Sequence, residues 1–508
     1  MSMATDSLDF EKSHRGVATG NKTRGSRAHN ASVSADDPGV RRRAVFGLTL
    51  FGADAAATVV ALAAGSILLG ADVARAGLAS LPLLLTSFWI LGLYEWDVLA
   101  PFERLRLRVF AVLAFGLGVL IVCGGPLRGS AWLAAGFESS AVLLLGFYGE
   151  IAVRSILVRR GIWGAPAAFV GDSPVAVQTY RLFASMPQLG LRPLGFLSTK
   201  TPSRRADVAA GVPSIGALGD PAVFRANGIE CIVAANKADF TRAAVATQQV
   251  GYPVDIFLAA DKSGGAKRPL AGGAKIIDLA AGADPNAGVN RQIKRAFDLA
   301  IAIPAAVLSL PLIGLAALAI RHIDGGPSFF IQPRIGRDGR PFNFVKLRTM
   351  VNDASEQLER RLAEDPAARA EWEQFCKLSN DPRVLPYVGR FLRRTSFDEL
   401  PQLWHVIRGE MSLVGPRPFP DYHIGMFDAQ FQALRTSVPP GLTGQWQVTS
   451  RSLGDIPTQK KEDLYYIRNW SIWLDLYLVL QTLPAIFLGH TGPISGRKPT
   501  LHSGVFST

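Results

Sequence analysis

Four long apolar stretches follow a polar beginning of the chain. They cover residues 45–70, 77–96, 107–124 and 131–153. Each is long enough to cross a hydrocarbon core of about 30 Å, which takes roughly 20 helical residues. The pattern therefore predicts four transmembrane helices within residues 41–160. Residues 1–40 are polar and predict a disordered tail on the cytoplasmic side.

Basic residues beside these stretches predict their orientation. Three groups of arginines flank the first stretch, the connection between the second and third, and the end of the fourth: Arg41, Arg42, Arg43, Arg104, Arg106, Arg108, Arg154, Arg159 and Arg160. The other two connections carry only Arg75 and Arg128. The positive-inside rule then places both ends of the four-helix region in the cytoplasm. Asp54 and Glu138 lie inside the stretches, where an acid that faces the bundle interior is favoured over a functional intramembrane acid.

From residue 164 the pattern changes to short strands that alternate with helices. Ala167–Gly171, Ile229–Ala234 and Val254–Leu258 read as strands, which predicts a small Rossmann-like α/β domain over residues 164–262. The turn at Gly171 has one glycine where a dinucleotide fingerprint has three, so no cofactor is expected there. Residues 263–290 are rich in Gly, Ala and Lys and predict a linker.

A fifth apolar stretch covers residues 296–320. Basic residues at both of its ends favour placing both ends on the same side of the membrane. Pro304 and Pro311 interrupt it, and an interior proline costs a helix about 3 kcal/mol. We therefore expect a re-entrant helix over residues 296–321 that enters one leaflet, breaks near Ser309–Pro311 and returns, with a full span as the alternative. The residues expected to shape this helix are Lys294, Arg295, Asp298, Ser309 and Pro311.

Composition narrows the class of protein. Hydrophobic residues make up 48% of the 508 residues and the formal net charge is +13, a combination that suits an anionic membrane face and phosphate ligands. No basic stripe with interleaved aromatic residues and no zinc-ligand spacing points to nucleic acid. The three cysteines are isolated in the sequence, which predicts neither a disulfide framework nor a metal site and fits a reducing compartment.

The segment Arg390–Pro418 carries the candidate chemistry. Two adjacent acids, Asp398 and Glu399, lie within a run of arginines. Because proline is tolerated near a helix start, Pro401 favours a helix that begins close to Asp398 and ends at Gly409. Both acids would then lie at the positive end of the helix dipole. The alternative for this pair is a structural capping box, with Ser396 as the cap and Glu399 three residues later.

Arginine and carboxylate side chains together indicate phosphate chemistry. Arginines match phosphate oxygens through a planar fork, and carboxylates among them can hold Mg²⁺ or attack phosphorus. The basic residues concerned are Arg390, Arg393, Arg394 and Arg417. Upstream, a predicted hairpin around Asp338 and Gly339 places Lys346 and Arg348 on one strand face, because side chains alternate along a strand. The segment therefore predicts a phosphate-transfer site.

These motifs resemble a known family. Residues 393–404 (RRTSFDELPQLW), 409–418 (GEMSLVGPRP), 346–350 (KLRTM) and 441–448 (GLTGQWQV) are similar to the signature of the bacterial sugar transferases, the monotopic phosphoglycosyl transferases. The resemblance covers roughly residues 290–495, and the layout upstream is similar to the long-form members. It implies a membrane α-helical N-terminal bundle, a Rossmann-like α/β middle domain, and an α+β C-terminal catalytic domain over residues 291–495 with a re-entrant membrane helix.

The resemblance also implies an activity. Members of this family transfer a hexose-1-phosphate from a UDP-sugar to undecaprenyl phosphate. For this chain the expected donor is UDP-glucose or UDP-galactose. UMP leaves, and the product begins an exopolysaccharide, capsule or O-antigen unit. The implied location is the bacterial inner membrane with the catalytic domain on the cytoplasmic face. The implied partners are the two substrates, membrane lipids and a second copy of the chain in a homodimer, without nucleic acid.

Site roles follow from the resemblance residue by residue. Asp398 is implied as the nucleophile, and Glu399 as the residue that positions the metal or handles the proton of the acceptor. Both are implied ligands of Mg²⁺. The implied diphosphate ligands are Lys346, Arg348, Arg393, Arg394 and Arg417. Since Asp398 would lie at a helix N-terminus among arginines, we expect its pKa to be depressed.

Two other classes of function remain as alternatives. One is a catalytically silent membrane scaffold, against which the complete set of acids and cations speaks. The other is a nucleotide-sugar-modifying enzyme that uses the Rossmann-like domain, against which the missing glycines speak. Near the C-terminus, Trp470, Trp473, Leu474 and Tyr477 form a helical stripe. Such a stripe is typical of either a membrane interface or packing onto the catalytic domain.

Overall fold

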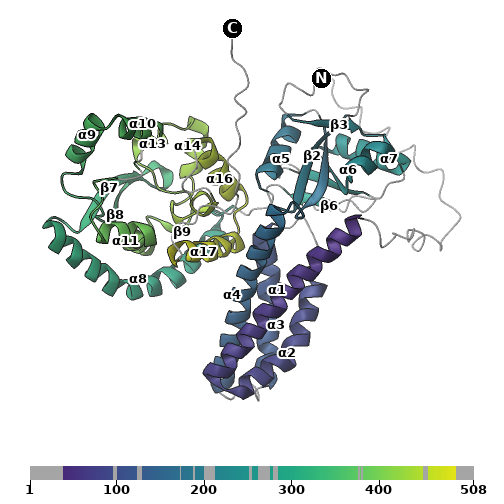
Figure 1. Ribbon diagram of the computed structural model, residues 1–508, viewed down its shortest axis with the longest axis horizontal. Coiled ribbons are helices and arrows are strands. Elements are labelled where there is room, and N and C mark those ends of the chain that lie inside the picture. The colour runs from purple at the N-terminus through teal and green to yellow at the C-terminus, as the bar shows by residue number, and fades with distance from the viewer. Residues whose placement is uncertain are drawn as a thin grey trace, which may run out of the picture. The chain divides into compact units, whose positions relative to one another are not determined.

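The computed structural model of the chain describes residues 38–94, 100–122, 129–171, 173–186, 189–198, 212–250, 254–260, 275–278, 284–375, 378, 381–449 and 456–487. The tail expected over residues 1–40 lies almost entirely outside the described residues. In chain order the described elements form a helical bundle, a parallel sheet with helices, and a mixed C-terminal part (Figure 1).

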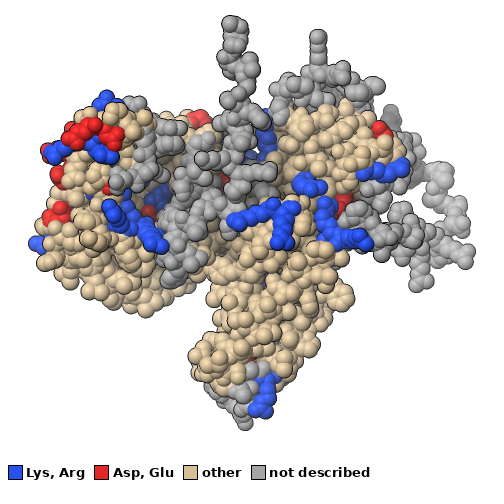
Figure 2. All heavy atoms as spheres, viewed as in Figure 1, with Lys and Arg blue, Asp and Glu red and all other residues tan. Residues whose placement is uncertain are grey.

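The bundle contains α1 (Pro38–Leu69), α2 (Ala71–Ile90), α3 (Pro101–Val122) and α4 (Gly129–Arg159). By length and apolar composition, Arg41–Leu69, Pro101–Val122 and Ala135–Arg159 can each cross a membrane, whereas the apolar part of α2, Arg75–Ile90, is shorter. Figure 2 shows a long uncharged surface on the bundle, with Lys and Arg confined to its ends. The described part of the chain therefore fits a membrane protein with several apolar helices.

Charged side chains inside the bundle face one another. Arg108 donates to Asp54 at 2.5 Å and to Glu150 at 2.7 Å, and Arg104 donates to Glu150 at 2.8 Å. All four side chains are buried. Burial of an ion is costly unless it is paired, so these ion pairs are what allow the charges to lie between apolar helices. Asp54 thus faces the bundle interior, as expected, and Glu138 is also buried there, although its carboxylate has no hydrogen-bond partner among the described residues.

The middle part is a six-stranded sheet with helices. Its strands are β1 (Ala165–Val170), β2 (Leu191–Ser198), β3 (Ser214–Ala217), β4 (Cys231–Ala234), β5 (Asp255–Ala260) and β6 (Lys275–Asp278). They pair in the order β3-β2-β1-β4-β5-β6, and every pairing is parallel. Its helices are α5 (Pro174–Ser185), α6 (Pro221–Asn227) and α7 (Lys237–Val250). This is the doubly wound arrangement of a Rossmann-like domain. The strand β6 lies within the residues expected as a linker.

The C-terminal part combines helices with short strands. It contains α8 (Gly288–Asp324), β7 (Phe329–Ile335), η2 (Arg337–Gly339), β8 (Pro341–Leu347), α9 (Ala354–Glu364), α10 (Pro366–Phe375), α11 (Val388–Thr395), η3 (Phe397–Gln402), α12 (Leu403–Arg408), β9 (Ser412–Val414), α13 (Asp421–Ile424), α14 (Ala429–Thr436), β10 (Gly441–Thr443), α15 (Gln445–Thr449), α16 (Ile456–Arg468) and α17 (Ile472–Phe487). The expected hairpin is present, because β7 and β8 pair antiparallel. Its turn has Asp338 and Gly339 at positive φ.

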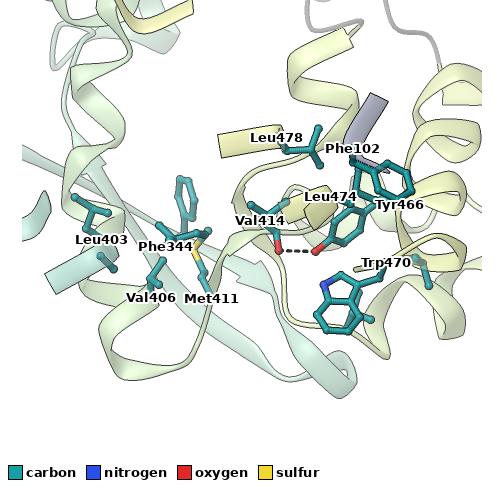
Figure 3. Packing of buried hydrophobic residues seen from close by; sticks show 14 residues of the cluster. Phe102, Phe344, Leu403, Val406, Met411, Val414, Tyr466, Trp470, Leu474 and Leu478 are labelled. Carbon is teal, nitrogen blue, oxygen red and sulfur yellow. Dashed lines mark hydrogen bonds between the residues drawn. The ribbon is translucent and has the colours of Figure 1, made fainter. Parts of the chain in front are cut away.

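The main core of the C-terminal part gathers residues from distant segments. Leu403 and Val406 of α12, Val414 of β9, and Tyr466 and Leu474 of the last two helices lie in one buried cluster. Figure 3 shows the Tyr466 hydroxyl directed at the Val414 carbonyl, to which it donates at 2.9 Å. Because β9 leads directly into the segment after Val414, this core fixes the start of that segment.

The residues of the expected aromatic stripe lie on one helix and on the connection before it. Trp470 lies between α16 and α17, and Leu474 lies on α17; both are buried in the same core. Trp473 and Tyr477 are partly buried against it. Packing onto the C-terminal part therefore accounts for Trp470 and Leu474, without the interface alternative.

The helix α8 runs without interruption through both prolines and is drawn as a curved helix in Figure 1. It is long and apolar enough to cross a membrane. The break expected near Ser309–Pro311 does not interrupt the helix in the structure. Ser309 donates to the carbonyl of Ala306 at 2.8 Å, and a hydroxyl bond of this kind to the preceding turn is typical of bent helices.

Both halves of α8 pack on the C-terminal part. Phe297 and Ile301 pack against the main core, while Ile320 lies with Leu347 and Leu392 in a second cluster. Other side chains of the helix are exposed, including Leu308 at 76%, Leu315 at 66% and Leu318 at 67%. The helix therefore lies along the C-terminal part and presents a row of leucines outward.

Candidate functional site

The two central acids lie on a tight helical turn rather than at the start of an α-helix. Asp398 and Glu399 occupy the first turn of η3, and the α-helix α12 begins only at Leu403. Ser396 adopts a left-handed conformation with φ 58°, and its side chain makes no cap hydrogen bond. A helix therefore does start near Asp398, as the 3-10 helix η3 rather than as an α-helix, whereas the capping-box alternative is wrong. A residue at positive φ separates α11 from η3, which the apolar pattern does not reveal.

The end of α12 is as expected. Gly409 has φ 82°, a conformation that glycine adopts without strain, and its N–H bonds the carbonyl of Val406 at 3.1 Å. Arg295 of α8 also donates to the carbonyls of Val406 and Ile407 at 2.5 and 2.6 Å. One arginine of the predicted re-entrant motif thus caps the helix that follows the two acids.

Asp398 is a buried carboxylate that faces cations. Its side chain is 8% exposed, and within the described part of the chain it accepts no hydrogen bond. Lys346, Arg393 and Arg417 each act on it electrostatically. Burial and the adjacent charge of Glu399 nevertheless outweigh these cations and raise the pKa of Asp398 to about 6. The expected depression of this pKa is therefore wrong, although the group is still mostly ionised at neutral pH.

Glu399, which lies in the same turn of η3 as Asp398, is hydrogen-bonded to Arg417. Arg417 Nη2 donates to Glu399 Oε1 at 2.7 Å, and both side chains are largely buried. Although burial lowers it, the charge and hydrogen bond of Glu399 raise the pKa of Arg417 above its usual value. The two neighbouring acids thus have different environments: Glu399 is hydrogen-bonded to an arginine, whereas Asp398 has no hydrogen-bond partner among the described residues.

Lys346 and Arg393 approach Asp398 from two other elements. Lys346 lies on β8 above the ring of Phe330, with Nζ 5.3 Å from the ring centre. Burial lowers the pKa of Lys346, and the charge of Asp398 partly offsets this effect. Arg393 of α11 donates to Thr349 at 2.9 Å, a residue just after β8. The hairpin and α11 are therefore joined beside the acid.

Two of the expected phosphate ligands are not gathered with these groups. Arg348 is buried, and its guanidinium donates to Asp324, to the carbonyl of Pro327 and to Asn352. It therefore ties the end of α8 to the segment after β8. Arg394 is exposed on α11.

The remaining residues expected to shape α8 form a buried network. Lys294 donates to Asp475 at 2.6 Å and to the carbonyl of Val414 at 3.0 Å. Asp298 accepts from the Ser412 hydroxyl at 2.8 Å and from the Leu413 N–H at 3.1 Å. The N-terminal half of α8 is thus hydrogen-bonded to β9, which leads into the segment that carries Arg417.

Two arginines near Arg417 were not identified from the sequence. Arg334 of β7 and Arg435 of α14 both donate to backbone carbonyls of the segment around Arg417. The hairpin register places Arg334 opposite Phe342 and Phe330 opposite Lys346, so Arg334 shares a face with Lys346. The alternation of side chains along a strand, which predicted the position of Lys346, could therefore also have predicted that of Arg334. For Arg435, no local sequence pattern signals its position.

Asp475 was also missed. It is completely buried in α17 and accepts from Lys294, from the Tyr466 hydroxyl at 2.8 Å and from Trp470 Nε1 at 3.1 Å. A single acid inside the apolar segment 472–487 is itself a signal, because buried acids in such segments have partners.

Comparisons with known proteins match the C-terminal part. The family model described as Bacterial sugar transferase matches residues 289–489. The UDP-galactose-lipid carrier transferase of Erwinia amylovora is 43% identical over 201 residues, which are 39% of this chain and 41% of that protein. The undecaprenyl-phosphate galactose phosphotransferase of Salmonella typhimurium is 40% identical over 199 residues, with the same coverage of 39% and 41%.

A shorter relative is matched over most of its length. The exopolysaccharide production protein ExoY of Rhizobium meliloti is 43% identical over 196 residues, which are 38% of this chain and 85% of that protein. In contrast, the match spans about two fifths of the length of the two longer relatives. The chain belongs to the bacterial sugar transferase family.

Proposed function

We propose that the chain transfers a hexose-1-phosphate from a UDP-sugar, glucose or galactose, to undecaprenyl phosphate and releases UMP. The reaction would begin the assembly of an exopolysaccharide, capsule or O-antigen unit. The names of the two longer relatives support a lipid carrier as the acceptor, and one of them names undecaprenyl phosphate. The name of the shorter relative supports exopolysaccharide production.

The observation that carries this proposal is the environment of Asp398. A carboxylate that is 8% exposed and accepts no hydrogen bond from the described residues is available to a ligand or a reacting atom. Burial removes the water that would otherwise solvate it and so makes it a better nucleophile. The cations beside it favour the arrival of an anionic substrate.

Charge at the site also supports an anionic donor. The basic residues around the two acids are Lys346, Arg334, Arg393 and Arg417. Four basic side chains against two carboxylates leave an excess of positive charge in a partly buried site. Burial lowers the pKa of Arg334 to about 10, and the charge of Arg417 adds to this effect. A nucleotide-sugar diphosphate compensates such an excess.

In the proposed reaction Asp398 attacks the phosphorus that carries the sugar. The bond from this phosphorus to the oxygen of UMP breaks, and UMP leaves with the bonding electrons. A phosphate oxygen of undecaprenyl phosphate then attacks the same phosphorus and displaces the Asp398 carboxylate. Lys346, Arg393 and Arg417 offset the repulsion between the carboxylate and the diphosphate in the first step.

The two acids fit a magnesium ion that is shared with the substrate. No group of three or more His, Cys, Asp or Glu side chains that could hold a metal occurs among the described residues. Mg²⁺ is commonly bound by one or two carboxylates together with substrate phosphates and water, and the unpaired Asp398 beside Glu399 supplies such ligands. The ion would add positive charge near the phosphorus when bound.

The contacts of α8 support an attachment to one side of the membrane. Both halves of the helix pack on the same catalytic part, and leucines face outward between them. An unbroken helix whose two halves both pack on one folded part can lie along one face of the membrane. Together with the arginine distribution, this attachment supports a catalytic domain on the cytoplasmic face of the inner membrane. UDP-sugars are made in the cytoplasm.

A labelling experiment tests the proposed function. Membranes that contain the full chain are incubated with UDP-glucose or UDP-galactose, radiolabelled in the sugar, without acceptor. We expect release of UMP and label bound to the protein, and both should be absent in Asp398→Asn, which keeps the shape and removes the nucleophile. The exposed Asp353→Asn is the matched control and should behave as the wild type.

Two results would count against the proposal. Absence of UMP release by the wild-type chain with every UDP-sugar tested, with or without undecaprenyl phosphate, would reject the transferase activity. Persistent covalent label in Asp398→Asn would instead assign the nucleophile to another residue.

A further inference from the structure

Every backbone carbonyl of the segment Pro416–Phe419, which carries Arg417, accepts a hydrogen bond from another part of the chain. Pro416 accepts from the Gly441 N–H at 2.9 Å, and Phe419 accepts from the Ile335 N–H at 3.0 Å. The two carbonyls between them accept from arginine side chains: Pro418 from Arg334 at 2.8 Å and Arg417 from Arg435. Two prolines also restrict the backbone of this segment. The path of the segment is therefore set by its neighbours.

Arg435 is the donor that acts on Arg417 itself. Its guanidinium carbon lies 4.5 Å from the ring centre of Phe419, and the residue is 4% exposed. Through Nε it also donates to Asp463 of α16 at 2.8 Å, and Asp463 is 5% exposed. One arginine thus joins α14, α16 and the backbone of Arg417.

A buried ion pair of this kind is rarely explained by stability. Removing both charges and filling the space with apolar side chains often leaves a protein equally stable or more stable. An apolar pair could replace the packing of Arg435 and Asp463, but it could not donate to the carbonyl of Arg417. The retained feature is the directed hydrogen bond.

We propose that Arg435, held by Asp463, is a positioning residue that fixes Arg417 toward Glu399 and the donor diphosphate. This inference rests on the proposed function. Arg417 extends from a backbone anchored at its own carbonyl, so its fork reaches Glu399 in one direction. Loss of the anchor lets the guanidinium move, and a misplacement of about 1 Å in a catalytic group can cost on the order of a hundredfold in rate.

The first test separates positioning from folding. Arg435→Leu leaves a buried, unpaired Asp463 and should lower both the melting temperature and the activity. The double variant Arg435→Leu/Asp463→Leu removes both charges, so its melting temperature should return toward that of the wild type. Its kcat/KM for the UDP-sugar should stay about ten- to a hundredfold low, with the KM for undecaprenyl phosphate unchanged. Recovery of activity together with stability would overturn the positioning role.

A double-mutant cycle gives a second test that does not depend on that recovery. Arg435→Lys keeps the charge beside Asp463 but lacks the second arm that reaches the carbonyl of Arg417. If Arg435 acts through Arg417, combining Arg435→Lys with Arg417→Lys should reduce kcat/KM little more than Arg417→Lys alone. Multiplication of the two single losses would overturn the inference.

The control variant uses a second ion pair between the same elements. Lys460 of α16 pairs with Asp428 beside α14, and both side chains are about half exposed. Lys460→Met should change neither kcat nor the KM for the donor. The activity of the wild-type chain in the same preparation separates the test of the proposed function from the test of the role of Arg435. An inactive wild type rejects the proposed function, whereas an active wild type with an equally active double variant rejects only the role of Arg435.

Discussion

The residue Asp398 combines reactivity with an energetic cost. An acid whose pKa is raised by burial binds its proton more tightly in the folded chain than in the unfolded chain. Its ionisation therefore opposes folding at every pH above its usual range. A nucleophile must be ionised, so the site keeps a charge that the fold alone disfavours.

The first prediction concerns the pH dependence of UMP release. Because the pKa of Asp398 is about 6, kcat/KM for the UDP-sugar should rise as the pH increases through about 6 and then level off. Rates of UMP release without acceptor, measured between about pH 5 and about pH 8, check this expectation. A profile that is flat over this range would indicate that the free protein already holds Asp398 ionised.

The second prediction concerns stability at the same residue. Asp398→Asn should unfold at a higher temperature than the wild type at about pH 8, because it removes a buried charge. Above the raised pKa, the wild type carries the full cost of that charge, and the cost falls progressively as the pH decreases from about 6 toward the usual value of 3.8. The difference in melting temperature should therefore shrink toward pH 5. A difference that grows on acidification would contradict the cause given for the pKa.

The sequence predicts the identity of these groups better than their environment. The motif around Asp398 and the alternation that includes Lys346 were enough to place both at one site. Burial of Asp398 depends on η3, and η3 depends on the left-handed Ser396, which no periodicity shows. The sequence pattern therefore could not predict the direction of the pKa shift of Asp398, although it did predict the basic residues beside this acid.

At the scale of the element, α8 is held by hydrogen bonds that begin at its N-terminal half. Lys294, Asp298 and Asp475 connect it to β9 and α17 in a region without access to water. The basic start and the acid of this helix were predicted from the sequence as features of a membrane element. Their partners come from residues more than a hundred positions later, which only the folded chain brings together.

The third prediction tests this network. Lys294→Met should destabilise the full chain by about 3–5 kcal/mol, because it leaves Asp475 buried without its cation. Lys294→Met/Asp475→Asn should recover a large part of this loss. Thermal or denaturant unfolding in detergent measures both variants. The exposed Arg360→Ala, which breaks a surface pair with Glu356, is the control and should cost less than about 1 kcal/mol.

At the scale of the whole molecule, three architectural regions follow one another along the chain. Runs of apolar residues predicted the bundle, and alternating short strands predicted the sheet region. The last strand of that sheet, β6, is short and follows a stretch rich in Gly, Ala and Lys, so composition favoured a linker there. The strand β6 has only four residues and is stabilised by its pairing with β5. Its own local sequence pattern is therefore too weak to predict it.

The fourth prediction concerns topology. The N-terminus, the connection near Arg104 and the region after α8 should all lie in the cytoplasm, because arginines gather at these places and both halves of α8 pack on the catalytic part. Reporters fused after Arg104, after Arg321 and at the C-terminus check this expectation. A periplasmic signal after Arg321 would overturn the re-entrant reading and would separate the site from UDP-sugars.

The outward row of leucines on α8 has a consequence for how the two substrates meet the protein. Under the proposed function, the nucleotide sugar arrives from the surrounding solution, whereas the lipid acceptor is dissolved in the layer that these leucines contact. Encounter with the acceptor is then a search in two dimensions, and its rate depends on the number of acceptor molecules per lipid. Diluting a vesicle suspension should leave that rate unchanged, while adding inert lipid to each vesicle should slow it.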